Sequence, residues 1–352
     1  MSRVACARVG WREAAALVLL WAAALAPACA QTGTPVAAPP AVPRPIDIPP
    51  WFAQSFLDLG DELQQAHQEK KRLLLYFGQD GCPYCRRLME VNFSQRAIVD
   101  KTRASFRAIA LDIWGDLEVT WTDGRRSTEK QLARQLKVQF TPTLLFLDEQ
   151  GRVETRINGY WPPHRFEAAL DYVSARPPGV TLAEYIERHA REAARDELND
   201  EPFLLKPPFD LRRRRGGKPL AVLFETRSCR ACDEMHAEGL QRPDMRALIP
   251  RFDIVRFALN DSAQLTTPSG RSLDAATWAR ELKVTYTPTV VFFDDANREV
   301  FRFEGYLRPF HLIGAFDYVA QGAYRTQPEF QRFLQAKADR LREQGQVVDL
   351  WR

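Results

Sequence analysis

The sequence predicts an α/β protein made of two tandem domains, each with a mixed central sheet flanked by helices. The length of 352 residues exceeds that of one ordinary domain, and a hydrophobic content of 45% is enough for two cores. A set of motifs recurs at a constant spacing, and each half shows the same order of strand-like and helix-like segments. Together these observations indicate a duplicated fold.

The two halves are related by an internal repeat. Five motifs of the first half recur 146 residues later, and the first cysteines of two Cys-x-x-Cys pairs are 147 residues apart. Agreement at so many points predicts that both halves fold alike. The matching segments are Gly124 and Gly270, 136–138 and 282–284, 141–143 and 287–289, 159–160 and 305–306, and 171–173 and 317–319.

The first 30 residues have the pattern of a secretory signal peptide. Three arginines precede an apolar run at 14–26, which is shorter than the ~20 residues that a permanent membrane helix needs. We expect cleavage before Gln31 and a periplasmic protein without an integral membrane segment. Lipid anchoring at Cys29 is an alternative, but Pro27 fits that pattern poorly.

The remaining chain divides by composition. Residues 31–50 are rich in proline and alanine, as in an extended tether. We expect the first domain at 51–180 and the second at 218–322, separated by a charged helix (181–199) and a linker within 181–217. Another charged helix (328–344) lies within the C-terminal segment 323–352. The arginine run 212–215 is interpreted as a solvated part of the linker.

Each half predicts the element order β-α-β-α-β-β-α. Helical crossovers join the first strands in parallel, whereas a short polar turn makes a hairpin of the last two. Amphipathic spacing at Leu132 and Leu136, and at Trp278 and Leu282, marks the helix before the hairpin. The expected strands are 72–77, 106–112, 144–148 and 153–157 in the first half, and 220–225, 254–259, 290–294 and 299–303 in the second.

The cysteines predict exchange chemistry. Cys6 leaves with the signal peptide, as Cys29 does unless it is lipidated, and the other four form two Cys-x-x-Cys pairs at expected helix starts. Exchange needs a thiolate that attacks and a nearby thiol that resolves the mixed disulfide. Helix N-termini favour the thiolate. The expected attacking cysteines are Cys82 and Cys229, and the expected resolving cysteines are Cys85 and Cys232.

Zinc binding and a fixed disulfide are the alternatives for these pairs. Zinc sites usually bring two such pairs within ~12 to 20 residues, whereas these pairs are 147 residues apart. Only His236 lies near a pair at ligand spacing, and we interpret it as part of a helix face. We therefore expect neither a metal nor another cofactor. With 49 basic and 45 acidic residues, the charge excess is too small to indicate a nucleic-acid partner.

Two Thr-Pro dipeptides are the second candidate feature. Pro142 and Pro288 follow the first cysteine of their pairs by 60 and 59 residues. A cis proline there would leave backbone groups free to hold an extended substrate beside the thiol. The alternative is an ordinary trans proline that enters a strand. The expected substrate-binding residues are Pro83, Tyr84, Thr141, Pro142, Arg230, Ala231, Thr287 and Pro288.

Cys82-Pro83-Tyr84-Cys85, the downstream Thr-Pro and the element order resemble the thioredoxin superfamily. The first half is most similar to SoxW-like periplasmic thioredoxins, over 77–82, 111–116 and 139–143. The resemblance implies a thioredoxin fold, a nucleophilic and a resolving cysteine, and a cis proline. The second half resembles the superfamily more loosely.

The sequence departs from the family pattern in its proton-handling residue. Many thioredoxins carry a buried aspartate six residues before the first cysteine, where this chain has Tyr76 and Leu223. Glu225, Asp80 or water are the candidate replacements. Pro83-Tyr84 is also the glutaredoxin dipeptide, which does not establish glutathione use.

These features predict an exported thiol-disulfide oxidoreductase that reduces or isomerises protein disulfides, with protein thiols and a membrane thiol-electron carrier as partners. A disulfide-donating oxidase would use the same residues. A non-catalytic binding or chaperone protein would hold unfolded chains with the Thr-Pro loops and the cleft between the domains, and its disulfides would be structural. A further alternative is that one domain reacts while the other docks or relays electrons.

Overall fold

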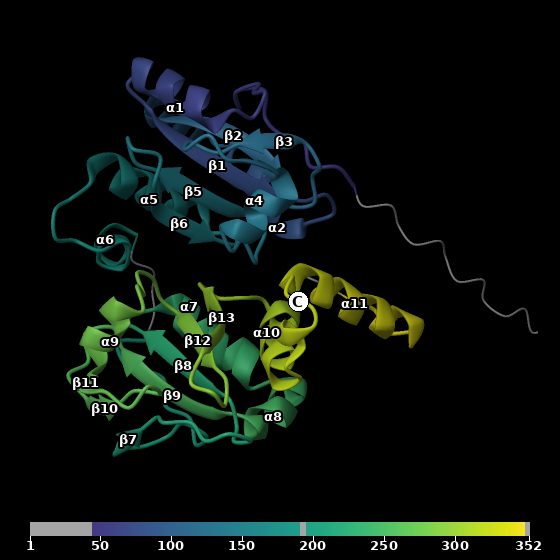
Figure 1. Cartoon of the computed structure of the whole chain (residues 1–352). Helices are drawn as coiled ribbons and strands as arrows, with labels where there is room; N and C mark the ends of the chain where they lie inside the picture. The colour runs from purple at the N-terminus through teal and green to yellow at the C-terminus, as the bar shows by residue number, and fades with distance from the viewer. Residues whose placement is uncertain (1–43, 191–194, 349–352) are drawn as a thin grey trace, which may run out of the picture. The chain divides into compact units, whose positions relative to one another are not determined.

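Two four-stranded sheets organise the computed structural model, which describes residues 44–190 and 195–348 (Figure 1). Both sheets are mixed and have helices on their faces, which confirms the predicted α/β architecture. The predicted signal peptide, the tether as far as residue 43, and Cys6 and Cys29 lie outside the described residues. Within the described ranges, none of the helices is long and apolar enough to cross a bilayer.

The first sheet has the strand order β2-β1-β5-β6. The central strand β1 (Arg72–Gly78) pairs in parallel with β2 (Phe106–Asp112) and antiparallel with β5 (Thr143–Leu147), and β5 forms a hairpin with β6 (Val153–Asn158). The crossover from β1 to β2 contains α2 (Pro83–Arg87), a π-helical segment (Leu88–Asn92) and α3 (Arg96–Ser105). The remaining helices of this half are α1 (Leu59–Gln68), α4 (Glu129–Gln135), α5 (Pro163–Ala175) and α6 (Leu182–His189).

The second sheet repeats this arrangement with the order β13-β12-β8-β9. Its strands are β8 (Leu220–Glu225), β9 (Asp253–Ala258), β12 (Thr289–Phe293) and β13 (Glu299–Glu304). All eight predicted sheet strands are therefore present, with ends shifted by at most one residue. The helical segments are α7 (Arg230–Glu234), a π-helical segment (Met235–Leu240), α8 (Pro243–Leu248), a 3-10 turn (Ile249–Arg251), α9 (Ala275–Glu281), α10 (Pro309–Ala320), a second 3-10 turn (Ala323–Arg325) and α11 (Phe330–Glu343).

Some elements differ from the prediction. The helix predicted at 181–199 ends at His189, and residues 195–199 are not helical. Arg195 instead donates its backbone N–H to Asp233 and accepts from Ser228 through its carbonyl. The structure also contains α1 and five short strands that the sequence did not predict: β3 (Glu118–Thr120), β4 (Arg126–Thr128), β7 (Phe209–Asp210), β10 (Gln264–Thr266) and β11 (Ser272–Asp274).

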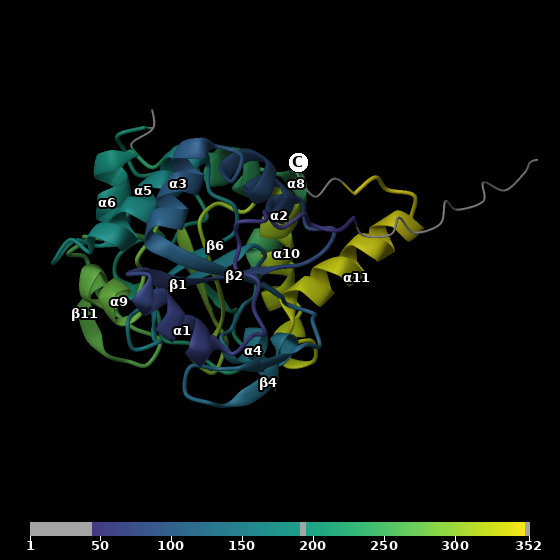
Figure 2. The same cartoon turned by 90° about the horizontal axis from the view of Figure 1, so that it is seen from above.

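The central strands are apolar on both faces because helices cover both sides of each sheet. Leu74 and Tyr76 face a core built with α2, α3 and α5, whereas Leu73, Leu75 and Phe77 face α1 and α4. Figure 2 shows these helices on opposite sides of β1 and β2. Burial on both faces explains why β1 and β8 read as continuous apolar runs.

Each half contributes one aromatic side chain to the hydrophobic core of the other half. Phe140 belongs to the core of the second half, where its ring lies 5.7 Å from Phe301 and 5.5 Å from Phe330. Tyr286, its counterpart 146 residues later, belongs to the core of the first half and stacks on Trp161 with a centroid distance of 4.1 Å. Both residues precede a Thr-Pro dipeptide, so this exchange joins the two halves directly beside the candidate sites.

Candidate functional site

Cys82 lies where β1 turns into α2. Gly81 has a φ of 73°, a left-handed conformation that glycine adopts without a steric cost, and it allows the chain to turn into the helix. Cys82 is the N-cap of α2, Pro83 is its first residue, and the Cys85 backbone N–H donates to the Cys82 sulfur at 3.1 Å. The predicted placement of this pair at a helix start is thus observed.

Thr141 contacts the same sulfur from the loop before β5. Its hydroxyl lies 3.4 Å from Cys82 Sγ, and its carbonyl oxygen is also 3.4 Å from that sulfur. Gln79 donates its side-chain amide to the Thr141 hydroxyl at 3.1 Å. The Thr141-Pro142 and Thr287-Pro288 peptide bonds are both cis, as predicted.

The two thiols of the first pair differ electrostatically. Burial raises the pKa of Cys82, but hydrogen bonds from Cys85 and Thr141 outweigh it, so that this pKa lies below its usual value. Burial raises the pKa of Cys85 well above its usual value, and the neighbouring Cys82 adds to the rise. Cys82 is therefore the thiol that ionises first, and Cys85 holds its proton.

The second pair is a disulfide. Cys229 and Cys232 are joined by an S–S bond, and Cys229 is the N-cap of α7. Ser228, at φ 54°, takes the left-handed position that Gly81 has in the first half. Thr287 does not contact a cysteine through its hydroxyl in the way that Thr141 does, because that hydroxyl lies 3.0 Å from the hydroxyl of Thr226.

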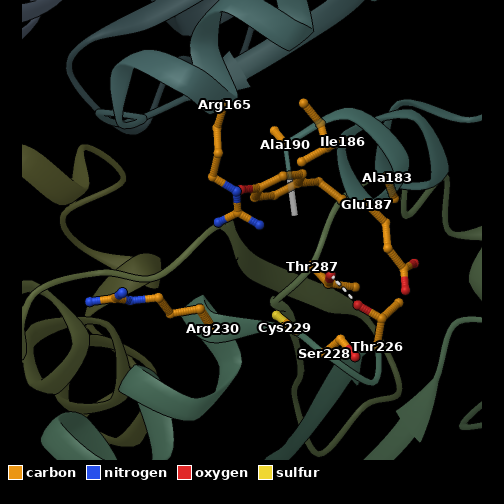
Figure 3. Close-up of a pocket in the computed structure, with 11 residues that line it drawn as sticks. Arg165, Ala183, Ile186, Glu187, Ala190, Thr226, Ser228, Cys229, Arg230 and Thr287 are labelled. Atoms are coloured by element: carbon orange, nitrogen blue, oxygen red, sulfur yellow. Dashed lines mark hydrogen bonds between the residues drawn. The ribbon is translucent and has the colours of Figure 1, made fainter. Parts of the chain in front are cut away.

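A hollow lies beside Cys229 (Figure 3). Arg230, Thr287 and Tyr286 line it from the second half, and Arg165 enters from α5. The Arg165 guanidinium lies 5.3 Å from the centre of the Tyr286 ring, at cation–π distance. The predicted residues Arg230 and Thr287 therefore share one hollow with Cys229, whereas Ala231 is buried beside the pair.

Tyr84, between the cysteines of the first pair, contacts a histidine of α10. The Tyr84 hydroxyl lies 3.4 Å from His311 Nδ1, and the two rings meet edge to face at 5.0 Å. Burial lowers the pKa of His311 to about 4, so that its ring is neutral at pH 7. No local sequence pattern indicates His311 as a site residue, because the contact joins positions 227 residues apart.

His236, four residues after Cys232, belongs to a buried cluster with two glutamates. His236 Nε2 lies 2.8 Å from Glu225 and Nδ1 lies 3.2 Å from Glu201. Burial lowers the pKa of His236, but both carboxylates outweigh it and the net shift is upward. His236 was expected to be part of a helix face, and the structure shows in addition that it is buried and contacts two carboxylates. No cluster of three or more potential metal ligands occurs in the described ranges.

The candidate proton-handling residues of the first half have separate positions. Asp80 accepts from the backbone N–H of Ile46 and lies on the surface. Tyr76, which occupies the position six residues before Cys82, is 2% exposed and belongs to the same core cluster as Cys82 and Cys85. Tyr76 is thus buried in one cluster with the first pair, whereas Asp80 is exposed.

Comparison with known families gives one match to each half. Residues 59–174 and 213–320, together more than half of the chain, match the family model described as a thioredoxin-like domain. No curated protein sequence matches the chain.

Among solved structures, the chain is similar to a thioredoxin-fold protein from Helicobacter pylori, with 27% identity over 30% of this chain and 70% of that one, and a TM-score of 0.27. It is also similar to a thioredoxin from Thermus thermophilus, with 23% identity over 33% of this chain and 83% of that one, and a TM-score of 0.27. A third similar structure is the DsbH oxidoreductase, with 18% identity, 37% and 84% coverage, and a TM-score of 0.24.

Proposed function

The chain belongs to the thioredoxin-like domain family, with one copy in each half, and from this premise we propose that it is a thiol-disulfide oxidoreductase. The observation that carries the proposal is the environment of the Cys82 sulfur, which lies at the start of α2 within hydrogen-bonding distance of the Cys85 N–H and the Thr141 hydroxyl. Cys82 has a lowered pKa and Cys85 a raised one, although both are buried. Exchange requires this division into an attacking thiolate and a thiol that reacts second.

The proposed reaction begins with attack by the Cys82 thiolate on a substrate disulfide. One substrate sulfur forms a mixed disulfide with Cys82, and the other leaves as a thiolate that takes a proton from water. Cys85 then loses its proton and attacks Cys82, which forms the Cys82–Cys85 disulfide and releases the second substrate thiolate. The substrate disulfide is thus reduced by two electrons, and the cysteine pair is oxidised.

We assign substrate positioning to the groups around the sulfur. Thr141 presents its hydroxyl and carbonyl to Cys82, and an extended substrate segment would pair with this loop. Pro83 and Tyr84 would contact the segment from α2, and the corresponding residues at the second pair are Arg230, Ala231, Thr287 and Pro288.

We further propose that the protein is exported to the periplasm, where it reduces or isomerises protein disulfides with electrons from a membrane thiol carrier. The signal-peptide pattern at 1–30 and the first half's likeness to SoxW-like periplasmic thioredoxins support this location. Fractionation of cells that express the full chain should find the mature protein in the periplasmic fraction, with Gln31 as its first residue. A mature protein that carries lipid on Cys29 would support the anchored alternative.

Insulin reduction tests the activity. The wild-type protein with dithiothreitol should precipitate insulin B chains rapidly, and Cys82→Ser should lose most of this rate. The matched variant Cys229→Ser measures how much of the insulin-reduction rate depends on the second pair. Wild-type behaviour of both variants would refute the catalytic assignment and favour a binding or chaperone role for the Thr-Pro loops.

Equilibration of each single pair with glutathione determines the direction of electron flow. A reductase should have a potential near the about −270 mV of thioredoxin, whereas a value near about −120 mV would indicate disulfide donation. Trapping with Cys85→Ser and Cys232→Ser decides whether both halves attack substrates. If only Cys85→Ser accumulates mixed disulfides, the second half docks substrate or relays electrons.

A further inference from the structure

The first cysteine pair shares its core cluster with a buried tyrosine. Tyr76 is on β1, its side chain is 2% exposed, and it shares a core cluster with Cys82 and Cys85. Its hydroxyl oxygen is fully buried and has no regular hydrogen-bond partner in the described part of the chain. A buried hydroxyl without a hydrogen bond costs free energy of folding and calls for an explanation. One explanation is that the Tyr76 hydroxyl donates a hydrogen bond in another state of the cysteine pair.

Cys85 packs in the same core cluster as this tyrosine, and each of the two groups shifts the pKa of the other. Burial raises the pKa of Tyr76, and the interaction with Cys85 is the next largest cause of the rise. In the opposite direction, Tyr76 is the side chain that lowers the pKa of Cys85 against burial and the neighbouring Cys82. Other titratable groups that act on the tyrosine are Cys82 and, at the end of β2, Asp112.

Because Gly78 has no side chain, the Tyr76 hydroxyl can occupy the space next to it. A Cβ atom built on Gly78 would collide with the Tyr76 hydroxyl group. Residues two apart on a strand face the same side, so Tyr76 and Gly78 share one face of β1. At the equivalent positions of β8 the second half has Leu223 and Glu225, which place a shorter side chain before a carboxylate. The two halves therefore fill this space with different polar groups.

We propose that the Tyr76 hydroxyl is the hydrogen-bond donor that stabilises the Cys85 thiolate when Cys85 attacks the mixed disulfide on Cys82. This proposal rests on the proposed function and adds a positioning residue to it. Tyr76 keeps its proton throughout, since burial makes its anion unfavourable. The proton of Cys85 passes to solvent, and the departing substrate thiolate takes a proton from solvent.

The test follows the two exchange steps separately. The background variant is the full chain with Cys6→Ser, Cys29→Ser, Cys229→Ser and Cys232→Ser, so that Cys82 and Cys85 are the remaining cysteines. Reduced protein is mixed with 5,5′-dithiobis(2-nitrobenzoate) in a stopped-flow instrument. Attack by Cys82 releases the first thionitrobenzoate, and attack by Cys85 on the mixed disulfide releases the second.

Tyr76→Phe should slow the second release about tenfold at pH 7, the effect of about one pKa unit on the Cys85 thiolate, and should leave the first release nearly unchanged. The rates of the variant and the parent should converge at high pH, where Cys85 is ionised in both. Gly78→Ala, which keeps the tyrosine but displaces its hydroxyl, should slow the same step. Tyr172→Phe is the matched control, because the Tyr172 hydroxyl donates to the carbonyl of Val180.

Equal second-step rates for Tyr76→Phe and its parent across the pH range would overturn the proposal, and so would equal slowing of both steps. If the parent itself releases neither thionitrobenzoate, the proposed function fails instead. The two failures are thus distinguishable in one experiment.

Discussion

At the scale of single residues, Thr141 and Cys82 form the most informative contact. The Thr141 hydroxyl and the Cys85 backbone N–H both lie at hydrogen-bonding distance from the Cys82 sulfur. The corresponding hydroxyl of Thr287 pairs with Thr226. The first cysteines of the two pairs therefore have different environments despite the same sequence motif.

Thr141→Val should raise the pKa of Cys82, because it removes a hydrogen bond that favours the thiolate. We expect the iodoacetamide alkylation rate of Cys82 at pH 6 to fall by about threefold to tenfold, with little change at high pH. Thr287→Val is the control and should leave this rate unchanged. An unaltered pH profile for Thr141→Val would contradict the assignment of the hydroxyl.

His311 should make the protein sensitive to acid. Its folded-state pKa of about 4 lies below the ordinary value, so the unfolded chain binds more protons as the pH falls below 6.5. Its contribution to stability is complete above pH 6.5 and declines by about 2 kcal/mol on acidification to pH 5. Thermal unfolding of His311→Gln should therefore show a smaller fall in Tm between pH 7 and pH 5 than the wild type.

His236 provides the opposite control. The pKa of His236 is raised by folding. Its contribution to folding stability is therefore complete below the unfolded-state pKa of about 6.5 and is lost as the pH rises through the folded-state pKa. His236→Gln should consequently show a larger fall in Tm on acidification than the wild type. Equal pH dependence of the two variants would contradict at least one of the two assignments.

At the scale of elements, α4 and α9 end in the same motif. Lys137, at φ 53°, donates its N–H to Arg134, and Val138 donates to Ala133, which is a Schellman arrangement. Lys283, at φ 56°, and Val284 repeat it after α9. Both halves thus place a lysine in a left-handed position that glycine would occupy at a lower steric cost.

Lys137→Gly should stabilise the protein by about 0.5–1 kcal/mol, since the relief of the left-handed conformation exceeds the entropy that glycine adds to the unfolded chain. Urea unfolding measures this change. Gln135→Gly, two residues earlier and still helical, is the matched control and should destabilise by about 1 kcal/mol. The same sign for both variants would rule out the left-handed explanation.

At the scale of the whole molecule, the exchanged aromatic residues connect the two halves. Phe140 packs in the second core and Tyr286 in the first, and Asn158 donates to Glu304 across the neighbouring strands β6 and β13. Thr143 and Thr289 anchor the loops by donating to the carbonyls of Phe140 and Tyr286, both at 2.8 Å. Each Thr-Pro loop is thereby held by the core of the opposite half.

Phe140→Ala should destabilise the protein by about 3–5 kcal/mol, the range for a buried phenylalanine. Because the lost contacts are to Phe301 and Phe330, hydrogen exchange should accelerate in β13 and α11 as well as around the substitution. Phe166→Ala, within the first core, is the comparison and should act mainly on the first half. Unchanged protection of β13 in Phe140→Ala would show that the halves unfold independently.

Much of this organisation follows from the sequence alone. The apolar runs, the two-residue spacing of the cysteines and the repeated Thr-Pro dipeptides predicted the eight sheet strands and the placement of both cysteine pairs at helix starts, because local periodicity and turn chemistry leave a direct record in the chain. The short hairpins β3–β4 and β10–β11 were missed because three-residue strands leave almost no periodicity.

The tertiary structure alone decided which distant side chains serve these pairs. Tyr76 lies on a strand and reads as part of an apolar run, and its position beside Cys85 arises only when α2 packs on that face of the sheet. His311 meets Tyr84 across 227 residues, and His236 becomes a buried ionic group only because Glu225 and Glu201 converge on it. Such contacts depend on packing between elements, which a single sequence does not encode in any local pattern.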